Sequence, residues 1–374
     1  MIYFIFILSL VSTIYFCSII WVILGFIKIK KVGNRHLSLN VEKNISVIIP
    51  VRNEASNIIN CLKSIEIQSF NNDKFEVIII NDNSTDNTKE IIDNYIKGSI
   101  LNIRLYSLSN KTSKKEALKF GIEKSTFEII ATTDADCIVP KKWLKCISSK
   151  VLEDAEMLLG PIDFKEKSGI LAGFQSLDMF ALQGVEFGAL AHLKPILNNA
   201  ANLSYSKKSF IDVDGFDEYK TPSGDDVFLL ERYKEKGKKI IGLLSKDFIV
   251  ETESENNFSN FFNQRLRWSS KSKYYSNKLL IYFSSIILLQ NLSLLFIYFG
   301  LPLVEKYRIH LIILLFSKWL IDFILLFLVA DFFERRRSLF YFLPVQFLYP
   351  IYIVVIWIAS MTMKFEWKGR KFNG

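Results

Sequence analysis

Long apolar segments at both ends of the chain restrict its fold more than any other feature of the sequence. Ile2–Ile27 contains no charged residue, and three further apolar segments follow late in the chain, at Leu279–Leu301, Ile309–Ala330 and Leu339–Met363. About 20 consecutive apolar residues are enough for a helix to span a bilayer. The sequence therefore predicts a multi-pass membrane protein in which residues 40–257 form a water-soluble domain.

Basic residues next to the apolar segments predict the orientation in the membrane. Those after the first segment are Lys28, Lys30, Lys31 and Arg35. The positive-inside rule places them, and the domain that follows, in the cytoplasm. Four complete spans would put the basic tail Lys364–Lys371 outside, against this rule. Because Pro344 and Pro350 interrupt the last segment, we expect an interfacial or re-entrant piece there and a cytoplasmic tail.

Composition narrows the class of partner. The net charge is +9, and basic residues close to apolar segments favour contact with anionic membrane lipids. No zinc spacing, helix-turn-helix or Arg-rich arm is found, so nucleic acid is not a predicted partner. The four cysteines form no paired framework, which is typical of a reduced compartment. The three histidines are scattered along the sequence, so we expect no histidine-based site. Asp, Glu, Lys, Arg and Gln are then the residues that would carry any chemistry.

Between the apolar ends, β-rich runs alternate with helical patterns. The predicted strands are Ile45–Val51, Phe75–Asn81, Ile103–Ser107 and Phe127–Thr133. The predicted helices are Glu54–Ile67, Thr88–Ile96 and Ser113–Lys124. This alternation predicts an α/β fold with a mostly parallel sheet covered on both faces. Such sheets bind ligands at the carboxyl ends of their strands.

Polar clusters follow three of the predicted strands, at Arg52–Glu54, Asp82–Asp86 and Asp134–Asp136. Asn, Asp and Ser also cap helices, so each cluster alone is ordinary loop chemistry. Three clusters at the same edge of one sheet predict a binding site.

Asp134 and Asp136 are the most informative of these residues, because alternation places them on the same side of an extended chain. Two adjacent carboxylates repel each other unless a cation lies between them. Mg²⁺ and Mn²⁺ prefer oxygen ligands and are commonly shared with substrate phosphates. We therefore expect a metal site that holds a diphosphate, and a turn with a helix cap before Trp143 is the alternative interpretation.

Later segments give two further expectations. Asp225 and Asp226 open a helical pattern, where they are either functional carboxylates or helix caps. The apolar helical pattern Ser168–Leu190 predicts either a buried core helix or a helix that lies on the membrane beside an amphiphilic acceptor.

The segment Phe258–Tyr275 combines an apolar face with basic residues and predicts an interfacial helix. Its Arg residues suit contact with phosphate. Farther on, Lys318 and Asp322 lie one turn apart in a predicted span, either as a neutralising pair or along a functional path.

An ordered set of motifs resembles the membrane-bound members of glycosyltransferase family 2, which have a GT-A fold. The motifs are Ile48–Glu54, Glu76–Asp86, Ser113–Leu118, Asp134-Ala135-Asp136, Asp225-Asp226 and Gln264-Arg265-Leu266-Arg267-Trp268. The resemblance covers roughly Ile45 to Trp268. Asn81 stands where the family usually has Asp, and Ser113 stands where it usually has Gly.

The resemblance implies a role for each matched residue. The implied donor-binding residues are Glu54 and Asp82 at the nucleoside, Lys114 near it or its phosphates, and Asp134 with Asp136 on a Mg²⁺ or Mn²⁺ ion that bridges the diphosphate. Asp226, beside Asp225, would take the proton from the acceptor hydroxyl, and its pKa would suit this role if other acids raise it. Gln264, Arg267 and Trp268 would shape the acceptor side and help to hold the diphosphate.

The implied organisation has four parts. These are an N-terminal transmembrane helix (1–31), a cytoplasmic GT-A domain (40–257), an interfacial helix (258–278) and a C-terminal transmembrane region with a basic tail (279–374). The implied function is inverting sugar transfer from a nucleotide-sugar, usually a UDP-sugar in this family, to a lipid or lipid-linked acceptor at the bacterial inner membrane.

Three alternatives stay open at this point. One is a processive polysaccharide synthase, which needs a polymer channel that few C-terminal spans can build. Another is a non-catalytic nucleotide-sugar-binding membrane protein, suggested by Asn81 and Ser113. The third is a phospho-accepting receiver domain, which would need an acidic pair where this chain has Asn53-Glu54.

Overall fold

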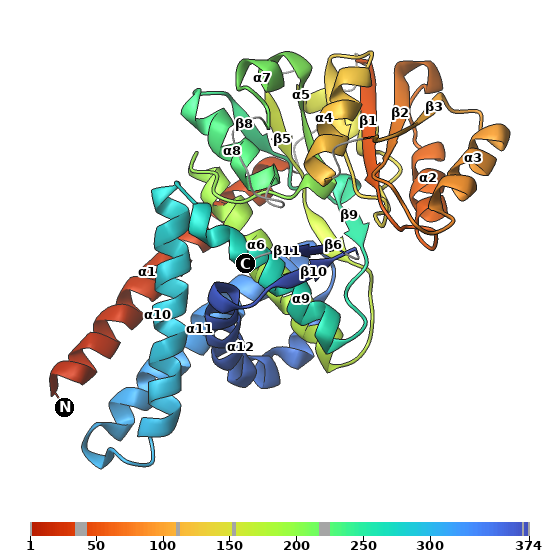
Figure 1. Cartoon of the computed structure of the whole chain (residues 1–374). Coiled ribbons are helices and arrows are strands. Elements are labelled where there is room, and N and C mark those ends of the chain that lie inside the picture. The colour runs from red at the N-terminus through yellow and green to blue at the C-terminus, as the bar shows by residue number, and fades with distance from the viewer. Residues whose placement is uncertain are drawn as a thin grey trace. The chain divides into compact units, whose positions relative to one another are not determined.

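The computed structural model describes residues 2–33, 43–109, 113–151, 155–216, 225–368 and 370–372. The chain divides into two compact units, each assembled from separate stretches of sequence (Figure 1). The sheet unit consists of Ile29–Lys165 and Leu197–Ser254. The helical unit consists of Met1–Lys28, Glu166–Ile196 and Glu255–Gly374.

The sheet unit is built on a seven-stranded sheet with the order β3-β2-β1-β4-β7-β5-β8. Its strands are β1 (Ile45–Val51), β2 (Phe75–Asn81), β3 (Ile103–Ser107), β4 (Ile129–Thr132), β5 (Met157–Leu159), β7 (Leu203–Ser206) and β8 (Ile240–Gly242). Among them, β7 runs antiparallel to both of its neighbours, and the other pairs are parallel. The predicted α/β class with a mostly parallel sheet is confirmed.

Helices cover this sheet because each presents an apolar face to it. They are α2 (Ile58–Glu66), α3 (Thr88–Gly98), α4 (Lys114–Lys124), α5 (Trp143–Val151), α7 (Lys207–Asp212) and α8 (Asp225–Glu235). Short 3₁₀ turns are η1 (Asn72–Lys74), η2 (Ala200–Asn202) and η3 (Lys246–Phe248), and a second parallel pair joins β6 (Ile162–Phe164) to β9 (Val250–Thr252). Three of the predicted strands have the predicted bounds. The first helix starts four residues later than predicted, since Glu54 O accepts from the N–H groups of both Asn57 and Ile58 in a turn.

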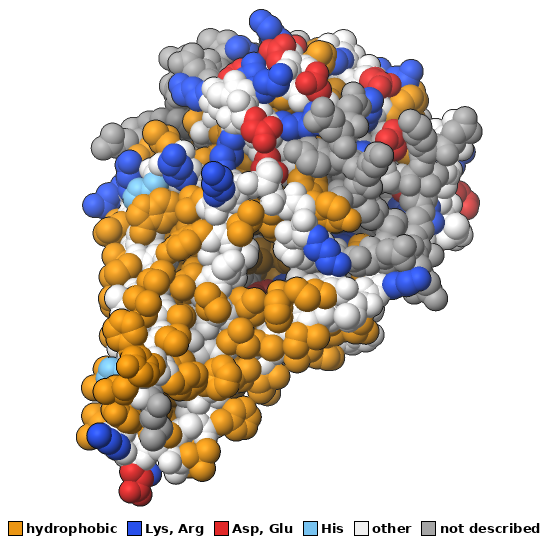
Figure 2. Space-filling view, turned by 60° about the vertical axis from the view of Figure 1, so that its left-hand side comes forward, with side chains coloured by type: hydrophobic (Ala, Val, Ile, Leu, Met, Phe, Trp, Pro, Cys, Tyr) orange, Lys and Arg blue, Asp and Glu red, His pale blue; other side chains and the backbone are white. Residues whose placement is uncertain are grey.

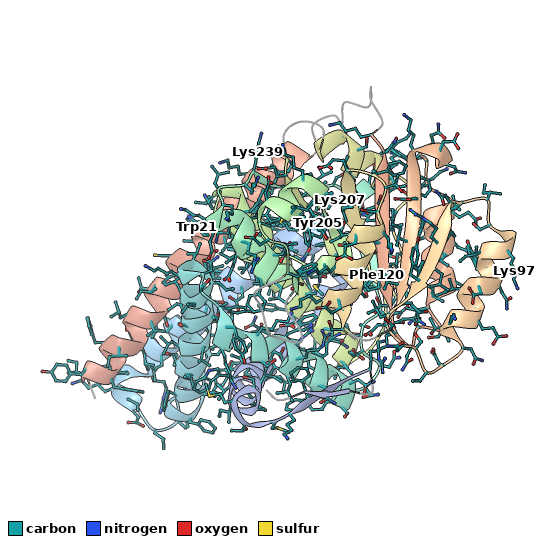
Figure 3. The ribbon with its side chains drawn as sticks, turned by 45° about the horizontal axis from the view of Figure 1, so that its top comes forward. Trp21, Lys97, Phe120, Tyr205, Lys207 and Lys239 are labelled. Atoms are coloured by element: carbon teal, nitrogen blue, oxygen red, sulfur yellow. The ribbon has the colours of Figure 1, made fainter. Side chains whose placement is uncertain are left out.

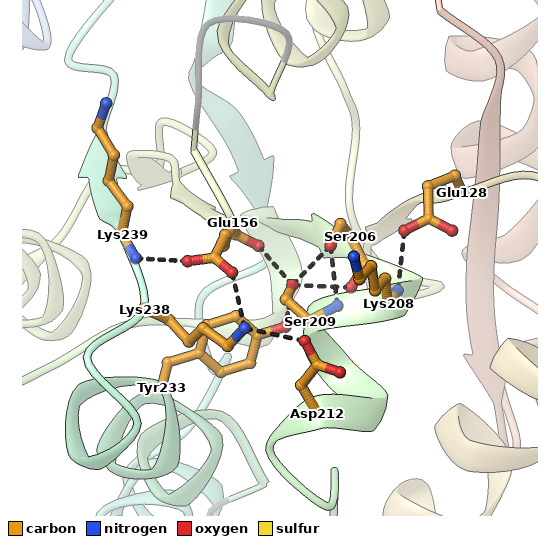
Figure 4. A network of polar contacts seen from close by, with 9 residues as sticks. All are labelled: Glu128, Glu156, Ser206, Lys208, Ser209, Asp212, Tyr233, Lys238 and Lys239. Carbon is orange, nitrogen blue, oxygen red and sulfur yellow. Dashed lines mark hydrogen bonds and ion pairs between the residues drawn. The ribbon is translucent and has the colours of Figure 1, made fainter.

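A polar network fastens α7 and α8 to the sheet at the edge where β4 begins (Figure 4). The Lys238 ammonium bridges Glu156, at 2.8 Å, and Asp212, at 3.0 Å. Although burial by itself raises the pKa of Glu156, hydrogen bonds from Lys238 and from the Lys239 backbone N–H lower it overall. The Tyr233 and Ser209 hydroxyl groups lie 3.1 Å apart and complete the link. This network is structural, because it lies at the opposite end of β4 from the predicted ligand edge.

The helical unit contains most of α1 and the later apolar helices. Its elements are α1 (Ile2–Gly33), α6 (Ile170–Ala191), α9 (Phe258–Ser270), η4 (Lys271–Tyr274), α10 (Lys278–Gly300), η5 (Glu305–Tyr307), α11 (Arg308–Phe332), η6 (Arg336–Tyr341), α12 (Phe342–Thr362) and the hairpin β10 (Phe365–Trp367) and β11 (Arg370–Phe372). Four helical segments in the described part of the chain are long and apolar enough to cross a membrane. Figure 2 shows apolar side chains gathered over this unit, with Phe6, Phe296, Phe316 and Leu320 among the exposed ones.

Helices α1 and α6 touch through their backbones. A methyl group on Gly188 would lie 2.5 Å from Val22 O, and one on Gly25 would lie 2.1 Å from Gly188 O. Near this contact, the ring of Trp21 (Figure 3) stacks on the ring of His192, with the ring centroids 4.2 Å apart. The N-terminal helix is therefore packed into the unit as closely as glycine allows.

Two ionisable side chains inside the helical unit, Lys318 and Asp322, form an ion pair. The Lys318 ammonium lies 2.7 Å from Asp322 Oδ2 and donates to Gln346 Oε1 at 2.6 Å. Tyr15 donates to Asp322 Oδ1 at 2.7 Å, so α1, α11 and α12 share one polar cluster. This arrangement forms the neutralising pair that the sequence suggested.

Helix α12 begins close to the start of α6 and ends beside α9. Before its start, the Tyr341 hydroxyl accepts from the Gly169 N–H at 3.1 Å. Near its end, Ala359 packs with Leu266 of α9 and with Phe365 of β10. Midway, Pro350 cannot donate to the carbonyl of Gln346, and the Tyr298 hydroxyl donates to that carbonyl at 3.1 Å instead. The interruption by proline is thus compensated from α10.

Candidate functional site

The loops that follow β1, β2 and β4 lie at one edge of the sheet. Strand β1 pairs in parallel with both neighbours, with Val51 opposite Asn81 and Ile48 opposite Thr132. Parallel pairing in this register brings the carboxyl ends of all three strands together. The three polar clusters predicted from the sequence therefore share one edge.

The first two loops are joined by hydrogen bonds. Arg52 Nη1 donates to the carbonyl oxygens of Asp82, at 2.6 Å, and Asn83, at 2.8 Å. Asn53 Oδ1 accepts from the Thr85 N–H at 2.8 Å. Asn53 and Asn83 both adopt left-handed backbone conformations, with φ of 53° and 52°, which asparagine tolerates better than most residues. The edge is thus a preorganised backbone structure.

The two predicted nucleoside contacts are buried at this edge. Glu54 is 7% exposed, and one of its carboxylate oxygens accepts from the Asn57 amide at 2.9 Å. Asp82 is 2% exposed, and its backbone N–H donates to Val51 O at 2.8 Å. The Glu54 carboxylate is thus held by a side-chain hydrogen bond, and the backbone of Asp82 is held by β1.

Asp134 and Asp136 follow β4 and are partly exposed, with two buried thiols behind them. The Cys137 thiol donates to Asp136 Oδ1 and the Cys61 thiol donates to Asp134 O, both at 3.6 Å. Burial raises the pKa of the Cys61 thiol, and the charges of Asp136, Asp134 and Glu54 raise it further. Three carboxylates thus act electrostatically on one thiol, which places them in one cluster.

Sequence reasoning missed the two cysteines. Cys61 lies in an apolar helical pattern and Cys137 lies in a loop, so neither carried a recognisable signal. Burial also raises the pKa of Cys137, followed by the charges of Asp136 and Asp134. Both thiols therefore remain protonated near neutral pH and can donate hydrogen bonds to the acidic loop.

Lys114 meets the acidic cluster from the start of α4. The Ser113 hydroxyl caps this helix by accepting from the Glu116 N–H at 3.1 Å. Lys114 Nζ lies 2.5 Å from Asp134 Oδ1, and the two side chains are 23% and 30% exposed. A cation at a helix N-terminus, beside two carboxylates, is a suitable place for a diphosphate together with a metal ion.

The two departures from the family motifs have local explanations. Asn81 Oδ1 accepts from the Ser84 N–H at 3.0 Å, which an aspartate could do equally well. The Asn81 amide also points to Ser107 Oγ, 3.5 Å away. Ser113 supplies the helix cap described above. Both residues therefore support the loops that carry Asp82 and Lys114.

The side-chain oxygen atoms at this edge suit a hard divalent cation. Asp134 and Asp136 offer carboxylate oxygens, which Mg²⁺ and Mn²⁺ prefer. Over the residues that the structure describes, no group of three or more His, Cys, Asp or Glu side chains could hold a metal ion. A metal ion at this pair would therefore take its remaining ligands from a substrate or from water.

The second carboxylate pair opens α8. Asp226 is partly exposed, and its Oδ1 accepts from the Val227 N–H at 2.9 Å. Farther along α8, Arg232 Nη1 donates to the carbonyls of Val213 and Asp214, each at 3.0 Å. The side chain of Asp225 lies outside the described part of the structure.

The remaining predicted residues belong to the helical unit. Gln264, Arg267 and Trp268 lie on α9 at i, i+3 and i+4, which places them on one face, and all three are partly exposed. The sheet unit thus holds Glu54, Asp82, Lys114, Asp134, Asp136 and Asp226, while the helical unit holds this motif.

The mostly parallel sheet, with acidic and basic side chains at its carboxyl edge, agrees with the predicted GT-A fold. Residues 46–186 match the family described as glycosyl transferase family 2. The predicted family is confirmed.

Curated relatives match part of the chain. Glycosyltransferase AglE of Haloferax volcanii is 32% identical over 33% of this chain and 41% of its own length. Poly-beta-1,6-N-acetyl-D-glucosamine synthase of Staphylococcus epidermidis is 28% identical over 45% of this chain and 42% of its own length. The chain thus spans about two fifths of each relative.

One solved structure shares the fold along almost the whole chain. It is the mannosyltransferase PcManGT of Pyrobaculum calidifontis in complex with GDP-Man and Mn²⁺. The match covers 96% of this chain and 99% of that one, with a TM-score of 0.56 and 15% identity. At this identity the likeness concerns the fold alone.

Proposed function

We propose that this chain is a membrane-bound inverting glycosyltransferase that moves a sugar from a nucleotide-diphosphate sugar to a lipid or lipid-linked acceptor. The observation that carries the proposal is the ion pair between Lys114 and Asp134, beside Asp136 and Glu54, at the carboxyl edge of the sheet. Opposite charges side by side at a partly exposed edge suit a ligand that carries its own negative charge together with a cation. A nucleoside diphosphate with Mg²⁺ or Mn²⁺ has this character.

The donor end of the reaction is assigned to the sheet unit. Glu54 and Asp82 are assigned to the nucleoside, and Lys114 to the phosphates. Asp134 and Asp136 would hold a divalent cation, which stabilises the negative charge of a departing diphosphate. Lys114 can exchange Asp134 for a phosphate oxygen without leaving the site, because both side chains are partly exposed.

Proton transfer is assigned to Asp226. Its carboxylate would accept the proton of the acceptor hydroxyl as that oxygen attacks the anomeric carbon. The bond to the diphosphate breaks on the opposite side, so one displacement inverts the configuration. Asp225 is assigned a supporting place beside it. Gln264 and Trp268 are assigned to the acceptor, and Arg267, whose guanidinium suits a phosphate, is assigned to the diphosphate.

A lipid acceptor is supported by the composition of the helical unit. The residues of the Gln264–Trp268 motif belong to the same unit as four apolar helical segments. In the proposed topology, α1, α10 and α11 cross the membrane. Helix α12, which runs unbroken through Pro350, lies in the membrane interface and does not turn back, so that α9 and the tail share the cytoplasmic side. This reconciles the basic tail with the positive-inside rule.

A processive polysaccharide synthase is the second candidate function. It is favoured by the match to a poly-N-acetylglucosamine synthase. Transfer of a single sugar is preferred because three full spans and one interfacial helix offer little wall for a polymer channel. The size of the product separates the two.

Nucleotide release from a panel of nucleotide-sugars, with Mn²⁺ or Mg²⁺ and native lipid extract, tests the proposal on the detergent-purified chain. We expect release from one donor, and loss of release in Asp226→Asn and after chelation. Asp247→Asn is the matched control, because Asp247 is an exposed carboxylate paired with Lys142. Absence of release from every donor, with metal-dependent nucleotide binding intact, would leave a non-catalytic binding protein. Absence of binding would refute the site.

A further inference from the structure

A buried ion pair lies directly behind the Gln264–Trp268 motif. Arg265 Nη2 of α9 lies 2.8 Å from Asp178 Oδ2 of α6, and the two side chains are only 3% and 5% exposed. Asp178 Oδ1 also accepts from the Tyr349 hydroxyl of α12 at 3.1 Å. A buried pair of this kind is costly to desolvate and fixes the geometry of the groups around it. It joins three helices of the helical unit at one point.

The guanidinium of Arg265 contacts two of the three motif residues. Its plane lies over the Trp268 ring, with the Arg carbon 4.1 Å from the ring centroid, and over the Phe261 ring at 4.9 Å. Its Nη1 donates to Gln264 Oε1 at 2.7 Å. Because Gln264 Nε2 donates in turn to Glu255 Oε1 at 3.1 Å, the amide of Gln264 is fixed in one orientation.

Exposure separates Arg265 from its neighbours. Gln264, Arg267 and Trp268 are partly exposed, whereas Arg265 is buried. Arg265 therefore cannot reach a substrate that approaches the exposed face of α9, but it can set the rotamers of Gln264 and Trp268. Asp178 holds Arg265 in that place from α6.

We propose that Asp178 and Arg265 are positioning residues for the acceptor, acting through Gln264 and Trp268. This inference rests on the proposed function. Asp178 holds the planar guanidinium of Arg265 against the Trp268 ring. A lysine in place of Arg265 could not both stack on this ring and keep the hydrogen bond to Gln264. Neither residue is assigned a contact with the donor, so their loss affects the acceptor step selectively.

The test compares transfer to acceptor with hydrolysis of the donor in water, using full-length purified protein. Asp178→Asn removes the charge at constant size, and Asp178→Glu restores it. We expect Asp178→Asn to lower kcat/KM for the acceptor about 10- to 100-fold, as misplacement of a substrate-positioning group does, with donor KM and donor hydrolysis unchanged. Asp178→Glu should recover part of the loss, and Arg265→Lys should behave like Asp178→Asn.

Asp322→Asn is the matched control, because Asp322 belongs to another buried ion pair of the same unit, with Lys318. It should lower the melting temperature without changing the ratio of transfer to hydrolysis. Equal losses of transfer and hydrolysis in Asp178→Asn, or an unchanged ratio, would overturn the inference and reduce the pair to a structural role.

A second measurement does not depend on activity. Acrylamide quenching of the Trp268 indole, taken as the difference between each protein and its Trp268→Phe counterpart, should increase in Asp178→Asn and stay constant in Asp322→Asn. Unchanged quenching in Asp178→Asn would refute the positioning role. If the wild type releases nucleotide from no donor while quenching changes as expected, the proposed function fails and the positioning of Trp268 stands.

Discussion

At the scale of single residues, the contact between Lys114 and Asp134 makes the sharpest prediction. Lys114→Met should raise KM for the nucleotide-sugar about 10- to 100-fold, since a hydrogen bond to a charged group contributes about 1.5–3 kcal/mol. Steady-state kinetics with varied donor would measure the change. Lys97→Met serves as the control, because Lys97 lies on α3, where it donates to Asn94. An unchanged KM would remove Lys114 from the donor site.

The lowered pKa of Glu156 gives a second prediction, for stability as a function of pH. A carboxyl group whose pKa is lower in the folded than in the unfolded protein stabilises the fold at pH values above its unfolded-state pKa, ordinarily 4.5 for this residue. This stabilisation is lost as the pH falls through the lowered pKa of the folded state. Lys238→Met should therefore reduce the melting temperature above pH 5, and the difference should shrink below pH 4.5. Lys236→Met, at an exposed neighbouring position, should show no such trend. A difference independent of pH would contradict this account.

How much of the site could be predicted also depends on single residues. Asp134 and Asp136 could be proposed only because two further polar clusters follow strands of the same sheet, since a carboxylate pair taken alone is ordinary loop chemistry, and their role at a metal ion stays a prediction. Cys61 and Cys137 could not, because their importance arises from burial beside charges that are distant in sequence. The functional roles of Asp226 and of Gln264 remain predictions, to be tested by the experiments above.

At the scale of secondary-structure elements, the contact of α1 with α6 predicts a steep dependence on side-chain size. Gly188→Ala should lower the melting temperature and cost about 1–3 kcal/mol of stability, because the added methyl group meets the Val22 carbonyl at 2.5 Å. Gly300→Ala is the control, because nothing lies within 4 Å of a methyl group there. Thermal unfolding in detergent would compare the two. Equal melting temperatures would mean that the helices separate readily.

Strand bounds were predicted more accurately than helix bounds. Strands β1, β2 and β3 have the predicted ends because apolar runs stop abruptly at polar residues. Helix α2 begins after a turn whose hydrogen bonds involve Glu54 and Thr88, and no local pattern announces such a turn. Periodicity reports which face is apolar and carries little information about where the first turn closes.

At the scale of the whole molecule, the sequence order did not reveal the division into units. Helix α6 lies between strands of the sheet in sequence, yet its residues belong to the helical unit. An apolar pattern such as Ile170–Ala191 predicts that the helix is buried, but it does not predict which other elements of the chain cover it. Only the packing with α1, α11 and α12 supplies that information.

The proposed topology predicts which side of the membrane each loop faces. A cysteine at Lys368, in the tail hairpin, should react with an impermeant maleimide only in inside-out vesicles. A cysteine at Leu303, which is 81% exposed between α10 and α11, should react only in right-side-out vesicles and serves as the opposite control. Reaction of both positions from the same side would mean that α12 crosses the membrane completely.

The close contact between Gly25 and Gly188 also has a consequence for biosynthesis. The ribosome releases α1 long before α6, so the surface of α1 around Gly25 must first face lipid or a chaperone. It finds its partner only after most of the sheet has been translated. In the proposed topology, the packing of α1 is complete only once the middle of the chain has been synthesised, and a chain that stops before Gly188 would leave α1 without this partner.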